Sequence, residues 1–462
     1  MSIPTIAEAA ALIATKKLSP VELTKACLAR LHATEETIHA FVLPTEERAL
    51  AEARAAEAAI MKDGPRGPMH GIPIGLKDIV DTAGLATTCQ SAILQDNVPT
   101  IDAACAAALK AAGTVLMGKL TTHEFADGGP SFELPKPPAR NPWNPDHFTA
   151  GSSSGTGAAV AAGVILCGIG TDTGGSIRGP AALCGIAGLK PTYGLVSRAG
   201  VAPAAFSLDH IGPMAWTAED CAIMLQVLAG HDPADPASAS QPIPDYRAAL
   251  TGELKGVRVG VIRHFHEADY PVAAATQTGI DTAVEVFRSL GASVEDVTVS
   301  PLQDWHACGS LISIVERAAA YEEWARTRLG DFSERVQRRL HLGALVSGVD
   351  YVQAVRRRRE LRSELQAAMR NLDVVITAGA QGEAPEMDAI PRWDSFANPS
   401  FTMPFNVTGY PAMCVCSGFG PGGLPVSVQI AGKPFRDATV LRVGDAFEKA
   451  TSFRSRRPAL VA

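Results

Sequence analysis

The chain lacks the features that would assign it to a membrane or a secretory pathway. Its most apolar stretch, residues 158–170, is too short and too rich in glycine to cross a bilayer. The first residues contain no basic region followed by an apolar run and a cleavage site, which is the pattern of a secretory signal. We therefore expect no contact with a membrane and no export.

Paired cysteines are also missing. The chain has nine cysteines, an odd number, and no two of them form a Cys-x-x-Cys pair. Disulfide frameworks and zinc ribbons both need paired spacings, so neither is expected. Reduced thiols are typical of the cytoplasm, and we predict a cytoplasmic protein.

An excess of positive charge is absent as well. The chain holds 41 Lys and Arg against 48 Asp and Glu, and its net charge is −7. Surfaces that bind nucleic acid in general are basic, so we expect no nucleic-acid partner. The one basic run, residues 356–359, falls on a predicted helix beside Glu360 and is interpreted as a solvated helix face.

What the sequence does contain is an alternation of strand and helix patterns. Short apolar runs predict buried strands, and longer stretches between them predict helices. The alternation indicates an α/β layered fold with a mostly parallel sheet. The expected strands are 72–76, 114–117, 257–262, 374–377, 412–416 and 426–430, the expected helices include 103–112, 155–163, 274–290 and 437–450, and the proline-rich segment 131–146 is expected to be a loop.

Two serines and a lysine stand at glycine-rich bends. Lys77 follows a predicted core strand, Ser152 lies in a Ser-Ser-Ser loop, and Ser176 follows two glycines. A lysine can activate a serine nucleophile, and the glycines expose N–H groups that could hold an oxyanion. Burial lowers the pKa of a lysine, and a neutral lysine is a competent general base.

Other catalytic patterns match incompletely. Residues 151–155 fit Gly-x-Ser-x-Gly, but no strand precedes them as in an α/β-hydrolase elbow. Lys119 resembles the lysine of a phosphate loop, but Leu120 replaces the Ser or Thr that would hold magnesium. The chain contains no Ser-x-x-Lys.

Two histidine-containing segments are alternatives. His123 begins a near-match to the zinc helix motif, but Asp127 stands where the second histidine belongs, so no metal is expected. Asp209 and His210 could join a Ser-His-Asp triad, yet adjacent residues point differently on most backbones. One triad cannot easily use both.

Taken together, the segments 71–81, 150–155, 170–178 and 185–194 resemble the lysine strand, serine loop and signature of the amidase signature family. The likeness runs from about residue 5 to the C-terminus, with Ala150 in place of the usual glycine. It implies a single domain over 1–462, built as three α/β/α layers around a large mixed sheet. Its parts are an N-terminal helical wrap (1–65), a signature core (66–230), and the remaining sheet and pocket (231–462).

The resemblance also implies roles for individual residues. Ser176 is the nucleophile, Ser152 relays protons and is joined to Gly151 by a cis peptide bond, and Lys77 is the base. No cofactor is implied. The backbone N–H groups of the oxyanion hole would be those of Thr173, Gly174, Gly175 and Ser176. Ser153 and Thr171 would lie near the lysine, and Asp172 and Arg178 would pair to support the glycine turn.

Two functions follow from the resemblance. The favoured one is an amidase that hydrolyses a carbon–nitrogen bond of a small-molecule amide, with carbamates and esters also open. The alternative is the glutaminase subunit of a tRNA-dependent amidotransferase. Arg362 aligns approximately with the arginine that binds the glutamine carboxylate in that branch. However, Pro399 replaces the acidic partner of the glutamine amine, and 316–331 lacks the expected Asn-Leu-x-Arg-Tyr-Asp-Gly segment.

We therefore expect a stand-alone hydrolase that needs only its small-molecule substrate. Family members are often dimers, so a homodimer is compatible with the resemblance. The candidate substrate-binding residues are Phe125, Asp127, Gly128 and Arg362.

Overall fold

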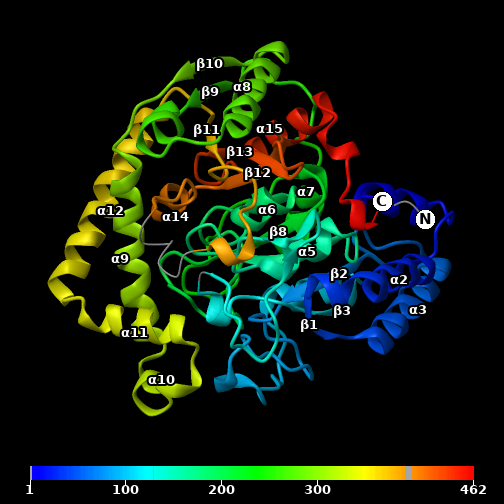
Figure 1. Ribbon diagram of the computed structural model, residues 1–462. Helices are drawn as coiled ribbons and strands as arrows, with labels where there is room; N and C mark the ends of the chain where they lie inside the picture. The colour runs from blue at the N-terminus through cyan, green and yellow to red at the C-terminus, as the bar shows by residue number, and fades with distance from the viewer. Residues whose placement is uncertain (1–2, 128, 391–397, 462) are drawn as a thin grey trace.

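A mixed sheet of eleven strands forms the centre of the molecule (Figure 1). The computed structural model describes residues 3–127, 129–390 and 398–461. In spatial order the strands are β1 (Phe41–Pro44), β3 (Val115–Leu120), β2 (Pro73–Lys77), β6 (Cys167–Asp172), β8 (His210–Ala215), β7 (Ala187–Lys190), β12 (Ala412–Phe419), β13 (Pro425–Gly432), β11 (Val374–Ala378), β9 (Arg258–Val261) and β10 (Ser293–Asp296). All three predicted segments of the chain thus contribute strands to one sheet.

Helices cover both faces of this sheet, which confirms the predicted three-layer α/β/α fold. Helices α5 and α6 pack on β2, β6, β7 and β12, whereas α7, α8 and α15 pack on β7, β8, β12 and β13. The helices are α1 (Ile6–Ala14), α2 (Pro20–Ile38), α3 (Glu46–Asp63), α4 (Ala104–Ala111), α5 (Ser154–Ala161), α6 (Arg178–Cys184), α7 (Ala218–Leu228), α8 (Ala274–Ser289), α9 (Leu302–Ala320), α10 (Glu322–Thr327), α11 (Glu334–Leu345), α12 (Gly348–Ala368), α14 (Met403–Thr408) and α15 (Asp437–Ala450).

The sheet is mixed, as predicted, but its parallel share is smaller than expected. Parallel pairing joins β3 to β2, β2 to β6, β11 to β9 and β9 to β10. Every other neighbouring pair of the sheet in the described residues is antiparallel, including those that involve β8, β7, β12 and β13. The two parallel blocks therefore flank an antiparallel centre.

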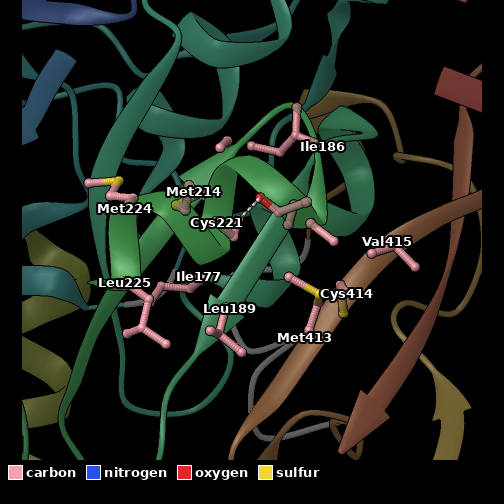
Figure 2. Close-up of a cluster of buried hydrophobic side chains, with 14 of the residues drawn as sticks. Ile177, Ile186, Leu189, Met214, Cys221, Met224, Leu225, Met413, Cys414 and Val415 are labelled. Atoms are coloured by element: carbon pink, nitrogen blue, oxygen red, sulfur yellow. Dashed lines mark hydrogen bonds between the residues drawn. The ribbon is translucent and has the colours of Figure 1, made fainter. Parts of the chain in front are cut away.

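The core lies where the central strands meet α6 and α7. Figure 2 shows Leu189 and Met214 from β7 and β8 packed with Cys221 of α7, and Met413 of β12 beside them. All four side chains are buried. Because strands in the middle of a layered sheet are covered on both faces, they read as continuous apolar runs rather than as alternating patterns.

Each predicted strand and helix overlaps an observed strand or helix. The Ser19 side chain caps α2, with Pro20 in the first turn and the Glu22 carboxylate accepting from the Ser19 backbone. The loop predicted over 131–146 is wrong in part, because β4 (Arg140–Asn141) and β5 (Asn144–Phe148) form a small antiparallel hairpin there.

No helix among the described residues is both long and apolar enough to cross a membrane. All nine cysteines are free and buried.

Candidate active site

Two neighbouring parallel strands bring a lysine and a threonine together. Lys77 is the last residue of β2, and Thr171 lies near the carboxyl end of β6. Lys77 Nζ is 2.8 Å from Thr171 Oγ1 and 2.6 Å from Ser152 Oγ. Carboxyl ends of parallel strands share one edge of a sheet, so the topology itself places these groups side by side.

The environment of Lys77 favours its neutral form. The side chain is fully buried. Burial lowers its pKa from the usual 10.5 to about 7, while the charges of Asp172 and Asp209 oppose that shift. A large share of the lysine is therefore unprotonated near neutral pH, which is the form that can accept a proton.

The serine loop is held against the lysine from several sides. The peptide bond between Gly151 and Ser152 is cis, which confirms the expectation from the family likeness. Ser153 Oγ accepts from the Thr171 backbone N–H at 3.2 Å. The Ser153 N–H in turn donates to the Ser176 carbonyl at 3.3 Å, and this bond joins the two serine segments.

A buried ion pair supports the glycine turn that ends in Ser176. The Asp172 carboxylate receives the Arg178 guanidinium through two hydrogen bonds of 2.8 and 3.0 Å. It also accepts from the backbone N–H groups of Gly175 and Ile177. Burial alone would raise the pKa of Asp172, but the charge and hydrogen bonds of Arg178 outweigh burial and hold that pKa below its usual range. The expected pairing is confirmed.

Because of this arrangement, not all of the predicted oxyanion donors are available to bind an oxyanion. The Gly175 N–H already donates to Asp172 Oδ1 at 2.8 Å. Gly175 has a φ of +128°, and a Cβ there would lie 2.2 Å from Thr402 Oγ1, so only glycine fits. Thr173 and Gly174 line the adjoining cavity with Ser176.

A cavity of about 360 Å³ opens in front of Ser176. One wall is formed by His123, Phe148 and Gly151, and Pro399 also borders the space. Its cationic lining comes from two helices, and consists of Arg317 on α9 and of Arg335 and Arg339 on α11. Guanidinium groups bind carboxylates through paired hydrogen bonds, so this lining suits an anionic substrate group.

The candidate substrate-binding residues lie in different surroundings in the structure. Phe125 does not line the cavity; its ring is buried in an aromatic cluster with Tyr321, Trp324 and Phe332. Arg362, which aligns approximately with a carboxylate-binding arginine, is exposed on α12 and is not among the residues that line the cavity.

Asp127 is close to the cavity through its partners. Its carboxylate lies 2.6 Å from Arg339 Nη1 and 3.8 Å from Arg317 Nε, and it is buried. Asp127 thus orients two of the three arginines. Gly128 lies outside the described residues.

The three arginines of the cavity are functional candidates that the sequence pattern did not indicate. They lie outside every segment that carries the family motifs. Their one local signal is the spacing of Arg335 and Arg339 by one helical turn, which puts both on one face of a helix.

The alternative catalytic patterns do not assemble into sites. The Asp209 carboxylate accepts from Thr173 Oγ1 at 2.6 Å, while His210 Nδ1 lies 2.6 Å from the Leu208 carbonyl, so the two do not form a triad. Lys119 Nζ donates to the Val80 carbonyl in a buried setting. Within the described residues no cluster of His, Cys, Asp and Glu could hold a metal ion.

The fold defines a hydrolase that acts on carbon–nitrogen bonds, and its site holds Lys77 and Ser152 in direct contact. The amidase family model matches residues 22–441, and the chain belongs to this family. It is 41% identical to a glutamyl-tRNA(Gln) amidotransferase subunit from Chloroflexus aurantiacus, over 99% of this chain and 98% of that protein.

Solved structures agree on the fold. The peptide amidase of Stenotrophomonas maltophilia superposes with a TM-score of 0.86 at 31% identity and 98% coverage of both chains. A glutamyl-tRNA(Gln) amidotransferase subunit from Thermotoga maritima gives 0.80 at 31% identity, with 96% of this chain and 94% of that chain covered.

These relatives overturn two predictions. The full-length likeness to a subunit of a tRNA amidotransferase contradicts the favoured small-molecule amidase. It equally contradicts the expectation of a stand-alone enzyme with no nucleic acid among its partners. Pro399 and the divergent segment 316–331 are local differences, and they carry less weight than an identity that extends over the whole chain.

Proposed function

We propose that this chain is the glutaminase subunit of an amidotransferase that acts on glutamyl-tRNA(Gln). The observation that carries the proposal is the 41% identity, over almost the whole of both chains, to a subunit of such an amidotransferase. The protein would hydrolyse the side-chain amide of glutamine and pass the ammonia to a partner chain. The nine free cysteines support a reducing, cytoplasmic setting for this assembly.

The cavity lining supports glutamine as the substrate. Its α-carboxylate would pair with the guanidinium groups of Arg335 and Arg339, with Asp127 orienting the latter. Its ammonium would meet hydroxyl and amide oxygens, because the side chains that line the same cavity include Ser310, Ser313 and Gln381. These acceptors would compensate in part for the acidic partner of the glutamine amine, which Pro399 replaces.

The proposed acylation uses the side chains of Lys77, Ser152 and Ser176. Neutral Lys77 takes the proton of Ser152 as Ser152 takes that of Ser176, across the 2.6 Å contact of Lys77 Nζ and Ser152 Oγ. Ser176 Oγ then bonds to the amide carbon. The backbone N–H groups of Thr173, Gly174 and Ser176 would donate hydrogen bonds to the oxyanion. The Gly175 N–H is not included because it already donates to Asp172.

Collapse of this intermediate breaks the carbon–nitrogen bond. The proton on Lys77 returns through Ser152 to the leaving nitrogen, and ammonia departs. A water molecule then attacks the ester on Ser176 and gives its proton to the same relay. Glutamate leaves, and Ser176 regains its hydrogen. Ser153 and Thr171 would position Ser152 and Lys77 and take no part in bond changes.

The test is ammonia release from L-glutamine by the purified full chain, alone and co-expressed with the partner chains and supplied with glutamyl-tRNA(Gln). We expect glutaminase activity that rises in the assembly and is lost in Ser176→Ala. Ser154→Ala is the matched control, because Ser154 belongs to the same loop but its hydroxyl donates to the Thr121 carbonyl, away from the relay. Absence of glutaminase activity in both preparations would refute the proposal.

A further inference from the structure

One aspartate beside the site has no task in the mechanism above. Asp209 directly precedes β8, which pairs with β6 in antiparallel fashion so that His210 lies opposite Asp172. The same register sets Asp209 beside Thr173, the residue that follows β6. Thr173 Oγ1 donates to Asp209 Oδ1 at 2.6 Å. Asp209 thus holds the side chain of a residue whose backbone N–H belongs to the proposed oxyanion hole.

The carboxylate of Asp209 is held by further hydrogen bonds. Oδ1 also accepts from the Ala205 N–H at 3.0 Å, and Oδ2 accepts from the N–H groups of Ala204 and Ala205 at 2.8 and 3.0 Å. Burial raises the pKa of Asp209, and the hydrogen bonds from Thr173 and from these two N–H groups oppose that rise. Because both oxygens accept from N–H or O–H donors, the ionised form fits this environment better than a protonated carboxyl, which would have to donate.

The charge of Asp209 acts on the buried lysine of the site. The ionisable groups that act on Lys77 come from several elements and are Asp172, Asp209, Cys89 and Arg317. The two carboxylates favour the protonated lysine, whereas Arg317 disfavours it. Asp172 already pairs with Arg178 at 2.8 Å. Because the charge of Asp172 is balanced by that partner, the carboxylate of Asp209 is the better candidate for stabilising a cation on Lys77.

The other ionisable groups around this pair are either balanced or uncharged. Those that face Asp209 or the lysine are Arg198, Arg317, Cys89 and Tyr321. Arg198 pairs with Asp235 at 2.7 Å, and Arg317 lies 3.8 Å from Asp127. Burial raises the pKa values of the thiol and the phenol well above their usual range, so both groups stay uncharged at working pH. The interaction with Asp209 is therefore the one that changes when the lysine gains a proton.

Charge develops at two places during the proposed acylation. Lys77 gains the proton of Ser152 across their 2.6 Å contact and becomes a buried ammonium. The amide oxygen becomes an oxyanion beside the Thr173 N–H. An ionised Asp209 stabilises the ammonium and stays ionised itself, since no proton passes to it. Its contact with Thr173 keeps the oxyanion donor in place.

We propose that Asp209 is a positioning residue of the hydrolytic reaction, which fixes Thr173 at the oxyanion hole and stabilises the ammonium form of Lys77 during proton transfer. This role rests on the proposed function and deepens it, since it concerns the same relay. Asp209 is not among the residues that line the substrate cavity. It borders a second cavity of about 240 Å³, together with Thr171. It therefore acts through other residues and not through a contact with the substrate.

The test is the pH profile of kcat/KM for L-glutamine in the full assembly. Asp209→Asn retains the shape of the side chain and removes its charge. On the alkaline plateau we expect kcat to fall about 10- to 100-fold, as loss of hydrogen bonds to a charged group does, with KM within about twofold. The acid limb should shift by about one pH unit to lower pH, because Lys77 loses a carboxylate that favours its protonated form. A residue that only shaped the loop would lower kcat without moving this limb.

Variants of Thr173 separate the contact from the charge. Thr173→Val removes the hydroxyl that donates to Asp209 and leaves the carboxylate in place, so kcat should fall while the acid limb keeps its position. Thr173→Ser restores a hydroxyl and should recover much of the loss. Asp235→Asn is the matched control for charge, because Asp235 borders the same second cavity but pairs with Arg198, and its acid limb should be that of the wild type.

Three results would overturn the proposed role. One is an acid limb that does not move in Asp209→Asn, and another is a plateau kcat in that variant equal to the wild-type value. The third is a wild-type kcat in Thr173→Val.

Unfolding measurements keep the inference independent of turnover. At about pH 6 Lys77 carries its charge and attracts Asp209, and at about pH 9 it does not. Asp209→Asn should therefore lower the urea midpoint more at about pH 6 than at about pH 9, whereas in a Lys77→Met background the two losses should be similar. Similar losses in the wild-type background would overturn the inference. If glutamine proves inert while this coupling is present, the link between Asp209 and Lys77 stands and the glutaminase proposal fails.

Discussion

At the residue scale, the proposed chemistry of the site depends on one buried lysine. Lys77 is completely buried, and its Nζ atom contacts the hydroxyl groups of Ser152 and Thr171. Such a group is costly for the fold in its charged form and useful for catalysis in its neutral form. Activity and stability should therefore both carry the signature of its titration.

Activity is expected to rise with pH through the pKa of Lys77. The lysine must be neutral to act as base, and burial sets its pKa at about 7. Below about pH 7, kcat/KM for glutamine should fall about tenfold per unit, and above about pH 8 it should level off. A pH profile from about 5.5 to about 9 measures this, and a flat acid limb would contradict the role of Lys77.

Stability should respond to the same group. Folding lowers the pKa of Lys77 from 10.5 to about 7, so between these values the unfolded chain binds the additional proton. The contribution of Lys77 to the free energy of unfolding therefore increases as pH rises from about 7 toward about 10. Urea unfolding of the wild type and of Lys77→Met at about pH 7 and about pH 9.5 should show the larger gain in the wild type. Equal gains would mean that the lysine is not desolvated.

The conservative variant Lys77→Arg tests basicity in a different way. A guanidinium keeps its proton at any working pH, so the variant should lose about a thousandfold or more in kcat although its size is similar. Turnover close to that of the wild type would remove Lys77 from the mechanism.

At the scale of elements, the site is made from the ends of β2 and β6, the start of α5, and the glycine turn before α6. The sequence predicted β2 and α5 because their apolar and small-residue patterns are local. It also indicated Ser176 through the glycine pattern, and the family resemblance implied the pair of Asp172 with Arg178. It did not indicate the partners of that pair on α14 and β13, because these contacts join residues 228 and 251 positions apart.

The arginines of the cavity could not be placed by the same reasoning. Arg335 and Arg339 look like surface residues of an amphipathic helix, and only the packing of α11 against α9 turns them toward Ser176. Arg362 is the opposite case. Its approximate alignment suggested that it binds a carboxylate, but its side chain is exposed to solvent.

The buried pair of the glycine turn should matter greatly for stability. Arg178→Met would leave the Asp172 carboxylate buried without its cation, and we expect a loss of about 3–5 kcal/mol in the free energy of unfolding. Arg326→Met is the control, because Arg326 pairs with Glu322 at the exposed surface and should cost less than about 1 kcal/mol. Denaturant titration of both variants measures the difference, and equal losses would contradict the role assigned to the pair.

At the scale of the whole molecule, one continuous core unites strands from the beginning, middle and end of the chain. The family resemblance was sufficient to predict this layered architecture. The activity class within the family could not be predicted in the same way, because the cavity is lined by side chains gathered from α9 and α11, which carry none of the family motifs.

The cysteines report on the integrity of this core. All nine are buried and free, and burial raises the pKa of Cys27 to about 11 and that of Cys105 to about 12. The native protein should therefore react slowly with Ellman's reagent, and nine thiols should appear once the protein is denatured. Fewer than nine in denaturant, without a reducing agent, would indicate a disulfide.

The hydrogen bonds that Arg178 makes to residues late in the chain have a consequence for folding during synthesis on the ribosome. The guanidinium donates to Asn406 and Gln429, so the turn that carries Ser176 gains its last supports only when translation is almost complete. A nascent chain has already exposed Lys77, Ser152 and Ser176 by then, but it lacks the scaffold that fixes them. We therefore expect truncated or unfinished chains to show no hydrolase activity, because the turn that carries Ser176 has not yet gained these supports.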